Sequence, residues 1–402
     1  MDSNIPDYVV RRKIESEAYK DSIRGCMIGG AVGDALGYPV EFFSTPDIYG
    51  DYGPYGITDY ELDRNSGKAL ISDDTQMTLF TANGLLFGNT RFNLRGTAAS
   101  QSAYIAMAYK DWHMTQTTQF ENKPSDCRHY FAYISWLCDI PELYRRRAPG
   151  NTCLDALSDP NNTRREDFVD PPINNSKGCG GVMRVAPLAL TRWVSTDVLL
   201  RQAAQTAAIT HGHPLGYMTA SVLCYIIHRV VFIEDYPIDL KKIVLEAKET
   251  VCDMFKECEY TSELAYIIDQ AVKLSENDEA DIDNIKCLGG GWVAEEALAI
   301  AIYCSLRYQN DFSSGIIAAV NHDGDSDSTG AITGNILGAL VGYDAIEEKW
   351  KQNLELADVI LEMADDLCYG CLMSEYSSYK DPAWENKYLF AEWNHSEVQR
   401  PF

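Results

Sequence analysis

Basic residues are scarce in this chain of 402 residues, where 34 lysines and arginines face 59 aspartates and glutamates. The resulting net charge of −25 argues against a nucleic-acid-binding protein, because phosphate binding needs clustered Lys and Arg. The basic run Arg145–Arg147 stands alone. An acidic surplus of this size suits a soluble protein that holds cations locally.

Long apolar runs are also lacking. No uninterrupted hydrophobic stretch of about 18 residues occurs, so no transmembrane span is expected. The polar opening MDSNIPDYVVRRKIE does not resemble a signal peptide, and we expect a cytoplasmic protein with free thiols. The twelve cysteines include one CxxC spacing, at Cys368 and Cys371. It lacks the second pair of a zinc site and is interpreted as structural.

Strand-like alternation is scarce, and helical periodicity dominates instead. Apolar residues recur every third or fourth position at 16–38, 74–88, 97–113, 127–146, 184–192, 198–209, 214–232, 239–257, 261–274, 291–308, 312–320, 328–341 and 345–367. Polar loops rich in Pro and Asn lie at 44–70, 114–126, 158–178 and 275–290. We therefore expect an all-α protein with a single domain over 1–402. Its core covers about 20–370, and an irregular tail covers about 372–402.

Glycine recurs every four residues in two of the predicted helices. The positions are Gly25, Gly29, Gly33 and Gly37 in the first helix and Gly330, Gly334 and Gly338 in the second. Glycine inside a helix costs about 1 kcal/mol relative to alanine, so its repetition needs a reason. Small residues four apart let two helix backbones approach closely. We predict that these two helices cross tightly; the alternative is that the glycines end the helices.

Two acidic clusters stand at predicted helix starts, and each combines two aspartates with flanking hydroxyls. Their members are Ser72, Asp73 and Asp74 in the first and Asp325, Asp327 and Ser328 in the second. Either cluster alone is explained by capping and by the helix dipole. Together they offer hard oxygen ligands that suit Mg²⁺, Mn²⁺ or Ca²⁺ rather than zinc or copper. Two divalent cations would balance the four negative charges.

The segment DGDSDS resembles the start of an EF-hand loop. With Asp323 at the first loop position, Ser328 falls where glycine is required and Gly334 falls where the bidentate glutamate is required. An EF-hand is therefore excluded. Asp323 itself is expected to be a solvated or capping carboxylate.

Several motifs in order give the chain a resemblance to a known family. They are GGAVGDALGYPVEF (29–42), SDDT (72–75), PGNTC (149–153), KGCGGVMRVAPLAL (177–190), THGHP (210–214), GGGWVAEEALAIAIYC (289–304) and GDSDSTGAITGNILGAL (324–340). Over about residues 20–370 the chain resembles the ADP-ribosylglycohydrolase family, of the dinitrogenase-reductase-activating type. The resemblance implies an all-α orthogonal helical bundle with a binuclear Mg²⁺ centre in a cleft.

The resemblance also implies a set of metal ligands and catalytic groups. By position the ligands of the two Mg²⁺ ions, or of Mn²⁺ as the alternative, are Ser72, Asp73, Asp74, Asp325, Asp327 and Ser328. Glu41 matches a glutamate that approaches the metals in relatives and moves when substrate enters. Catalysis is expected to involve Asp74, Glu41 and Asp73. Relatives often have Thr at the two hydroxyl positions, and serine keeps the oxygen ligand.

A glycine-rich loop resembles the diphosphate-binding loop of the family. The substrate-binding residues implied are Gly178, Cys179, Gly180, Gly181, Val182, Met183 and Arg184, together with His211. Glycines let backbone N–H groups close on phosphate oxygens, and Arg184 follows at a predicted helix start. Cys179 stands where many relatives have Asn. Trp292 is expected in the core, with a place in the cleft wall as the alternative, and Asp34 is expected to orient the metal ligands.

The implied activity is hydrolysis of the C1″ N- or O-glycosidic bond between ADP-ribose and an acceptor. The metals would hold the ribose hydroxyls and activate water, with Asp74 or Glu41 as the base. The expected substrate is ADP-ribosyl-arginine, on a protein or a small molecule, with ADP-ribosyl-serine and free ADP-ribose derivatives as alternatives. Two other classes stay open: an inactive ADP-ribose-binding relative, and a metal-dependent phosphohydrolase. The sequence does not indicate an oligomeric state.

Overall fold

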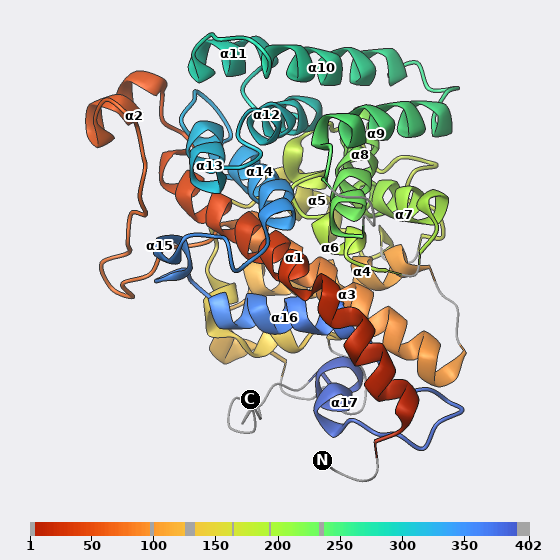
Figure 1. Cartoon of the computed structure of the whole chain (residues 1–402). Coiled ribbons are helices and arrows are strands. Elements are labelled where there is room, and N and C mark those ends of the chain that lie inside the picture. The colour runs from red at the N-terminus through yellow and green to blue at the C-terminus, as the bar shows by residue number, and fades with distance from the viewer. Residues whose placement is uncertain are drawn as a thin grey trace.

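The computed structural model describes residues 5–96, 100–124, 133–162, 165–192, 194–232 and 237–391. Within these ranges the chain folds into helices, and pairing of β type is limited to isolated bridges. The predicted all-α class is confirmed. Figure 1 shows α1 (Asp7–Gly37) running through the middle of the bundle beside α14 (Ser326–Val341).

Helices α1 and α14 touch through their backbones, and their glycines face one another. The facing pairs are Gly25 with Gly338, Gly29 with Gly334, and Gly33 with Gly330. A Cβ atom built on Gly29 would overlap the carbonyl oxygen of Gly334, and the reverse also holds. Only glycine permits so close a crossing. The predicted tight packing of the two glycine-rich helices is confirmed.

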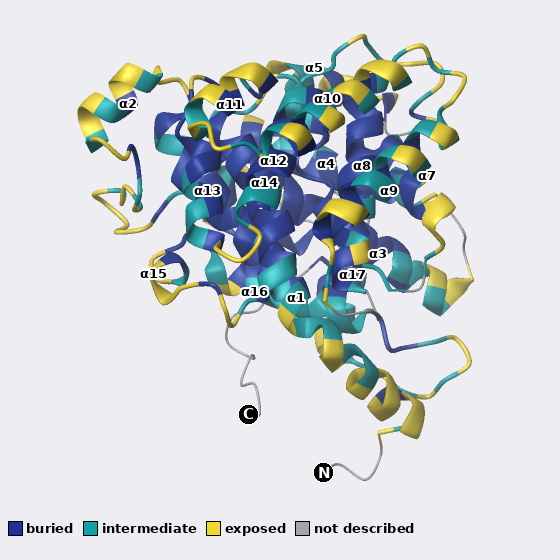
Figure 2. Ribbon diagram, turned by 45° about the horizontal axis from the view of Figure 1, so that its top comes forward, coloured by how far each residue is buried: buried dark blue, intermediate teal, exposed yellow. Residues whose placement is uncertain are grey.

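The other helices pack around this central pair. On the α1 side lie α3 (Asp73–Arg95) and α16 (Ala357–Tyr369), and on the α14 side lie α8 (Pro214–Val231), α12 (Ala294–Arg307) and α13 (Phe312–Val320). Helix α4 (Gln101–Thr117) packs on the outer side of α3. An outer set comprises α7 (Thr196–Ala208), α9 (Leu240–Met254) and α10 (Thr261–Leu274). Figure 2 shows that buried residues gather in the central helices and that exposed residues lie on the outer ones.

Helix α8 is long and apolar enough to cross a membrane by length and composition alone, but 83% of it is buried inside the protein. It is therefore the core helix that its contacts with α7, α9 and α14 indicate. The cysteines of the described ranges are free thiols, as expected, and these include Cys368 and Cys371.

Three predicted helices are broken up or much shorter in the structure. The helix predicted at 127–146 begins in a segment, 125–132, that lies outside the described residues; the rest forms two 3₁₀ turns, Trp136–Asp139 and Pro141–Tyr144. That prediction is wrong, and Pro141 starts the second turn. The helix predicted at 345–367 is split into α15 (Glu348–Lys351) and α16, because Gln352 is extended and Asn353 and Leu356 take left-handed conformations with φ 62° and 54°.

Four short helices were not predicted. They are α2 (Thr45–Tyr52), α5 (Asn151–Ser158), α11 (Asp281–Leu288) and α17 (Pro382–Leu389). Each has eight residues, too few for a clear apolar period. Helix α17 lies in the tail that was predicted to be irregular. The segment predicted as a helix at 184–192 contains only α6 (Ala186–Ala189).

Substituting Gly334→Ala should lower the free energy of unfolding by about 3 kcal/mol, because the added methyl group has no room against the backbone of α1. Urea denaturation followed by circular dichroism measures the change. The matched control is Gly50→Ala in α2, where a Cβ atom meets nothing within 4 Å. Equal stability of Gly334→Ala and Gly50→Ala would contradict the tight crossing.

Candidate active site

A cleft of about 340 Å³ collects most of the residues that the sequence predicts as a site. The predicted residues that line it are Glu41, Asp73, Asp74, Gly178, Cys179, Gly180, Met183, His211, Asp325, Asp327 and Ser328. They come from the segment after α1, the start of α3, the glycine-rich loop, the segment before α8 and the start of α14. Segments far apart in the sequence therefore meet in one cavity.

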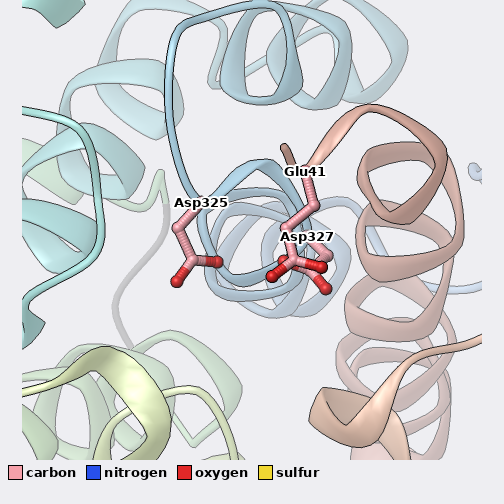
Figure 3. Close-up of side chains that lie close together, drawn as sticks. All are labelled: Glu41, Asp325 and Asp327. Atoms are coloured by element: carbon pink, nitrogen blue, oxygen red, sulfur yellow. The ribbon is translucent and has the colours of Figure 1, made fainter. Parts of the chain in front are cut away.

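Three carboxylates form the centre of the cleft. Glu41, Asp325 and Asp327 are buried, and each offers an oxygen atom within 4.8 Å of the others. Figure 3 shows Glu41 reaching from the segment after α1 toward the two aspartates at the start of α14. The close crossing of α1 and α14 brings these two chain segments together.

Both acidic motifs lie at helix N-termini. The Ser72 hydroxyl accepts a hydrogen bond from the Asp74 amide at 3.2 Å, and the Asp325 carboxylate accepts one from the Ser328 amide at 3.2 Å. Asp73 and Asp327 stand in the first turns of α3 and α14. Capping is thus present at both helices, and the helix dipoles stabilise the negative charges of the same carboxylates.

Asp34 fixes the backbone of the first acidic motif through hydrogen bonds. Its fully buried carboxylate accepts hydrogen bonds from the backbone amides of Ser72 and Thr75, at 3.0 and 3.1 Å, and from the Thr75 hydroxyl. These bonds fix the turn that carries Asp73 and Asp74. Asp34 does not line the cleft, in agreement with the orienting role expected from the sequence. Burial raises the pKa of Asp34 to about 6.

Burial and mutual repulsion raise the pKa values of the cluster. Burial, followed by the charges of Asp325 and Asp73, raises the pKa of Glu41 to about 9. Burial also raises the pKa of Asp327 well above its usual range, and the neighbouring charge of Asp74 adds to the shift. Asp74 and Asp327 belong to different motifs and line the same cleft, so the two motifs lie side by side.

The cluster fits a divalent cation. Glu41 Oε2 and Asp74 Oδ2 are buried without a hydrogen-bond partner. Buried polar atoms are almost always paired, so each of these oxygens is available to a cation or to a hydrogen-bond donor. The donors are hard oxygen atoms, which suit Mg²⁺-like ions. Ser328 lies in the cleft, whereas Ser72 lies beneath it, and the predicted ligand role of Ser72 stays a prediction.

The glycine-rich loop lies directly beside the acidic cluster. The Cys179 amide donates to the Trp292 carbonyl at 3.2 Å, and its thiol donates to Asp325 Oδ2 at 2.7 Å. A Cβ atom at Gly180 would stand 2.9 Å from His211 Cε1, so glycine is needed there. Burial and then the Asp325 charge raise the pKa of Cys179 well above its usual range, which keeps the thiol protonated.

The GGGW segment holds Asp325 in place. The Asp325 amide donates to the Gly290 carbonyl at 2.8 Å. Gly324 has φ 155°, and a Cβ atom there would overlap the Gly290 carbonyl, so a side chain would displace Asp325. Asp323 accepts a hydrogen bond from the Thr45 amide at the start of α2, which is the capping role expected for it.

Two aromatic residues of the cleft differ from the sequence predictions: Trp292 was expected elsewhere, and Phe42 was not expected at the site. Trp292 is 45% exposed and lines the cleft, so its expected place in the core is wrong. Its ring stacks on Phe42, with centroids 5.7 Å apart and planes at 23°. Phe42 follows Glu41 directly, a signal that was available in the sequence. The cleft wall also includes 148–152, which overlaps the quoted motif PGNTC.

Three predicted substrate-binding residues do not line the cleft. Gly181 and Val182 are buried beneath the loop, and Arg184 is fully buried with its guanidinium donating to the Thr210 hydroxyl at 2.7 Å. The predicted contact between Arg184 and a diphosphate is therefore corrected. The side chain turns inward because Tyr109, 4.3 Å from the guanidinium carbon, and Thr210 provide its partners inside the protein.

Comparisons with known proteins show the family of the chain. A family model described as ADP-ribosylglycohydrolase matches residues 15–376. ADP-ribosylhydrolase ARH3 of Bos taurus is 26% identical over 363 residues, covering 83% of this chain and 88% of the relative. ADP-ribosyl-(dinitrogen reductase) glycohydrolase of Rhodospirillum rubrum is 23% identical, covering 84% and 91%. A solved structure titled ADP-ribosylglycohydrolase-related protein complex aligns with TM-score 0.58 and 23% identity, covering 88% and 98%.

The chain belongs to the ADP-ribosylglycohydrolase family, because the family model covers nearly its whole length. It is a glycosidase-type hydrolase of the kind that removes ADP-ribose. The alignment with the solved structure agrees with the all-α fold. An uncharacterised protein of Archaeoglobus fulgidus is also similar, with 27% identity over 361 residues and coverage of 87% and 96%.

Adding Mg²⁺ to the metal-free protein should release protons at pH 7. Without a cation, Glu41 with a pKa of about 9 holds a proton, whereas a carboxylate that binds metal must lose it. A pH electrode in weakly buffered solution should record about one proton or more per chain. Affinity for Mg²⁺ should fall as the pH is lowered.

The control for proton release is Asp323→Asn, which removes an exposed carboxylate outside the cleft and should leave the release unchanged. Calorimetry would show that Mg²⁺ is bound. Binding of Mg²⁺ with no proton release would contradict the raised pKa of Glu41.

Proposed function

We propose that this chain hydrolyses ADP-ribosyl-arginine, releasing ADP-ribose and an unmodified arginine side chain, with two Mg²⁺ ions in the acidic cluster. Mn²⁺ is the alternative ion. The observation that carries the proposal is the meeting of Glu41, Asp325 and Asp327 in one cleft. Family membership supplies the reaction class.

The ions are assigned to the two acidic motifs, and Glu41 lies beside them. The proposed ligands are Ser72, Asp73, Asp74, Asp325, Asp327 and Ser328. When bound, such ions fix hydroxyl groups of the distal ribose and lower the pKa of a coordinated water. Glu41 Oε2 and Asp74 Oδ2, the two unpartnered oxygens, are the groups that would take the proton of the attacking water.

The carboxylates also suit the charge that develops during the reaction. Cleavage at C1″ builds positive, oxocarbenium-like charge on the ribose, and an acidic cleft stabilises it. Asp34 takes no direct part but holds the turn of Asp73 and Asp74. The protonated Cys179 thiol does not serve as a nucleophile, because nucleophilic attack requires the thiolate.

The loop from Gly178 to Gly180 is proposed to hold the diphosphate. It lies between the carboxylates and His211, and glycine lets its backbone approach a ligand closely. A diphosphate bound here would place the distal ribose toward Asp325, which the Cys179 thiol contacts.

The rim of the cleft supports an arginine acceptor. Phe42 is 72% exposed and stacks on Trp292 beside the carboxylate of Glu41. A guanidinium is planar and cationic, so it stacks on aromatic faces and is attracted by carboxylates. A serine acceptor offers neither a planar group nor a charge to this rim.

Asp325→Ala should reduce the release of ADP-ribose to background, because it removes a ligand from the centre of the cluster. Alanine at Asp73, Asp74 or Asp327 should have the same effect. The assay is chromatography of the products from an ADP-ribosyl-arginine peptide with Mg²⁺. Asp323→Asn serves as the active control. Release at a near-normal rate by Asp325→Ala would count against the proposed centre.

The same assay distinguishes the two alternative functions, a metal-dependent phosphohydrolase and an inactive ADP-ribose-binding protein. A phosphohydrolase would form inorganic phosphate or AMP in place of intact ADP-ribose. An inactive relative would bind ADP-ribose, with or without EDTA, and form no product. The proposal expects intact ADP-ribose in the presence of Mg²⁺ and none after EDTA treatment.

ADP-ribosyl-arginine peptides should be hydrolysed faster than ADP-ribosyl-serine peptides. Phe42→Ala should lower kcat/KM for the arginine peptide about fivefold, since a cation–π contact contributes about 1 kcal/mol. The matched control is Phe92→Ala, an exposed phenylalanine on α3 outside the cleft. A preference for the serine peptide, left unchanged by Phe42→Ala, would reject the arginine acceptor while leaving the hydrolase intact.

A further inference from the structure

Arg184 is a buried cation with an unusual set of partners. It is fully buried, its guanidinium carbon stands 4.3 Å from the centroid of the Tyr109 ring, and its Nη1 atom is 3.3 Å from the sulfur of Cys153. Its Nε atom has no hydrogen-bond partner. Burying a charge is costly unless its partners compensate it. The shortest hydrogen bond of this guanidinium must therefore supply a large part of the compensation.

That contact is the hydrogen bond from Arg184 Nη2 to Thr210 Oγ1, at 2.7 Å. A guanidinium is always a donor, so the Thr210 oxygen must accept. The single hydroxyl proton of Thr210 is then free to point elsewhere. Its neighbour is His211 Nδ1, at 2.8 Å, and the Cys153 sulfur is much farther, at 4.0 Å. Donation to His211 Nδ1 is therefore the arrangement that gives this proton its nearest acceptor.

This direction of donation decides the tautomer of His211. Burial, followed by the charge of Arg184, lowers the pKa of His211 to about 3, so the imidazole is neutral at physiological pH. A neutral imidazole carries one proton. Since Nδ1 accepts from Thr210, the proton is on Nε2.

The Nε2 edge of His211 faces the glycine-rich loop. Built Cβ atoms at Gly178 and Gly180 would stand 3.2 and 3.3 Å from Nε2, and all three residues line the cleft. The imidazole is only 2% exposed. Nε2 thus lies at the place where the loop would hold an anionic ligand.

We propose that Arg184 and Thr210 are positioning residues that fix His211 as an Nε2–H donor to a phosphate oxygen of ADP-ribose. The inference rests on the proposed function, which places the diphosphate on this loop. The opposite tautomer would present a lone pair to the phosphate and would repel it. Arg184 does not touch the ligand in this arrangement. It acts through two hydrogen bonds in series, from Arg184 to Thr210 and from Thr210 to His211.

Nitrogen NMR tests the tautomer directly. The Mg²⁺-loaded protein is labelled with ¹⁵N-histidine, and the His211 signals are assigned by their loss in His211→Gln. At neutral pH the spectrum should show a protonated Nε2 and an unprotonated Nδ1. A protonated Nδ1 in the wild-type protein would overturn the proposal, and this result needs no variant at Thr210.

Variants of Thr210 test the link. Thr210→Val removes the hydroxyl with little change of shape and should give a mixed or reversed tautomer, whereas Thr210→Ser should keep the wild-type spectrum. Thr210→Val should also weaken binding of ADP-ribose, with Mg²⁺ present, about tenfold or more, and Thr210→Ser should restore it. Unchanged tautomer and affinity in Thr210→Val would refute the link.

Substitutions of His211 test the donor. The amide nitrogen of His211→Gln reaches the position of Nε2, whereas that of His211→Asn reaches only the position of Nδ1. Calorimetry with ADP-ribose should show a loss of about tenfold or more for Asn and a smaller loss for Gln. Equal losses would overturn the donor role.

The experiments also distinguish this inference from the proposed function. A protonated Nε2 without any ADP-ribose binding would refute the proposed function, whereas a protonated Nδ1 with normal hydrolysis would refute only this inference.

Discussion

The backbone contact between α1 and α14 is the constraint on which the site depends. Because Gly29 and Gly334 bring the helix axes together without intervening side chains, the ends of the two helices are fixed relative to each other. Helix α1 leads into Glu41, and α14 begins beside Asp325 and Asp327. A wider crossing would move these carboxylates apart. The repeated glycines, costly for an isolated helix, are therefore explained by the site at the end of the crossing.

Electrostatic repulsion opposes this arrangement. Five buried carboxylates converge on the cleft, and burial works against their charged forms. The dipoles of α3 and α14 and the hydrogen bonds of Asp34 offset part of the cost, because they favour the charges and hold the turn. In our proposal a bound cation compensates the remainder. The acidic cluster would then lower the stability of the metal-free fold and raise its affinity for an ion.

Much of the fold and of the acidic cluster could be predicted from the sequence, because local patterns indicate both. The helical period, the glycine spacing and the two acidic motifs are all read within short windows. The predictions that failed concern features that depend on contacts between residues far apart in the sequence. Arg184 turns inward because Tyr109 and Thr210 meet it there, and no local pattern shows this. The break at Leu356 has no Gly or Pro to announce it. The apolar residues at 133–146 have the spacing of a helix, but the structure buries them in the core from two 3₁₀ turns.

The most direct test of the central claim is a crystal structure of the protein soaked in Mn²⁺, with the anomalous signal of the metal recorded. The account predicts anomalous peaks within about 2.3 Å of carboxylate oxygens from both acidic segments, with Asp74 on one side and Asp327 on the other. Absence of a peak between the start of α3 and the start of α14, or a peak bound by only one of them, would contradict it.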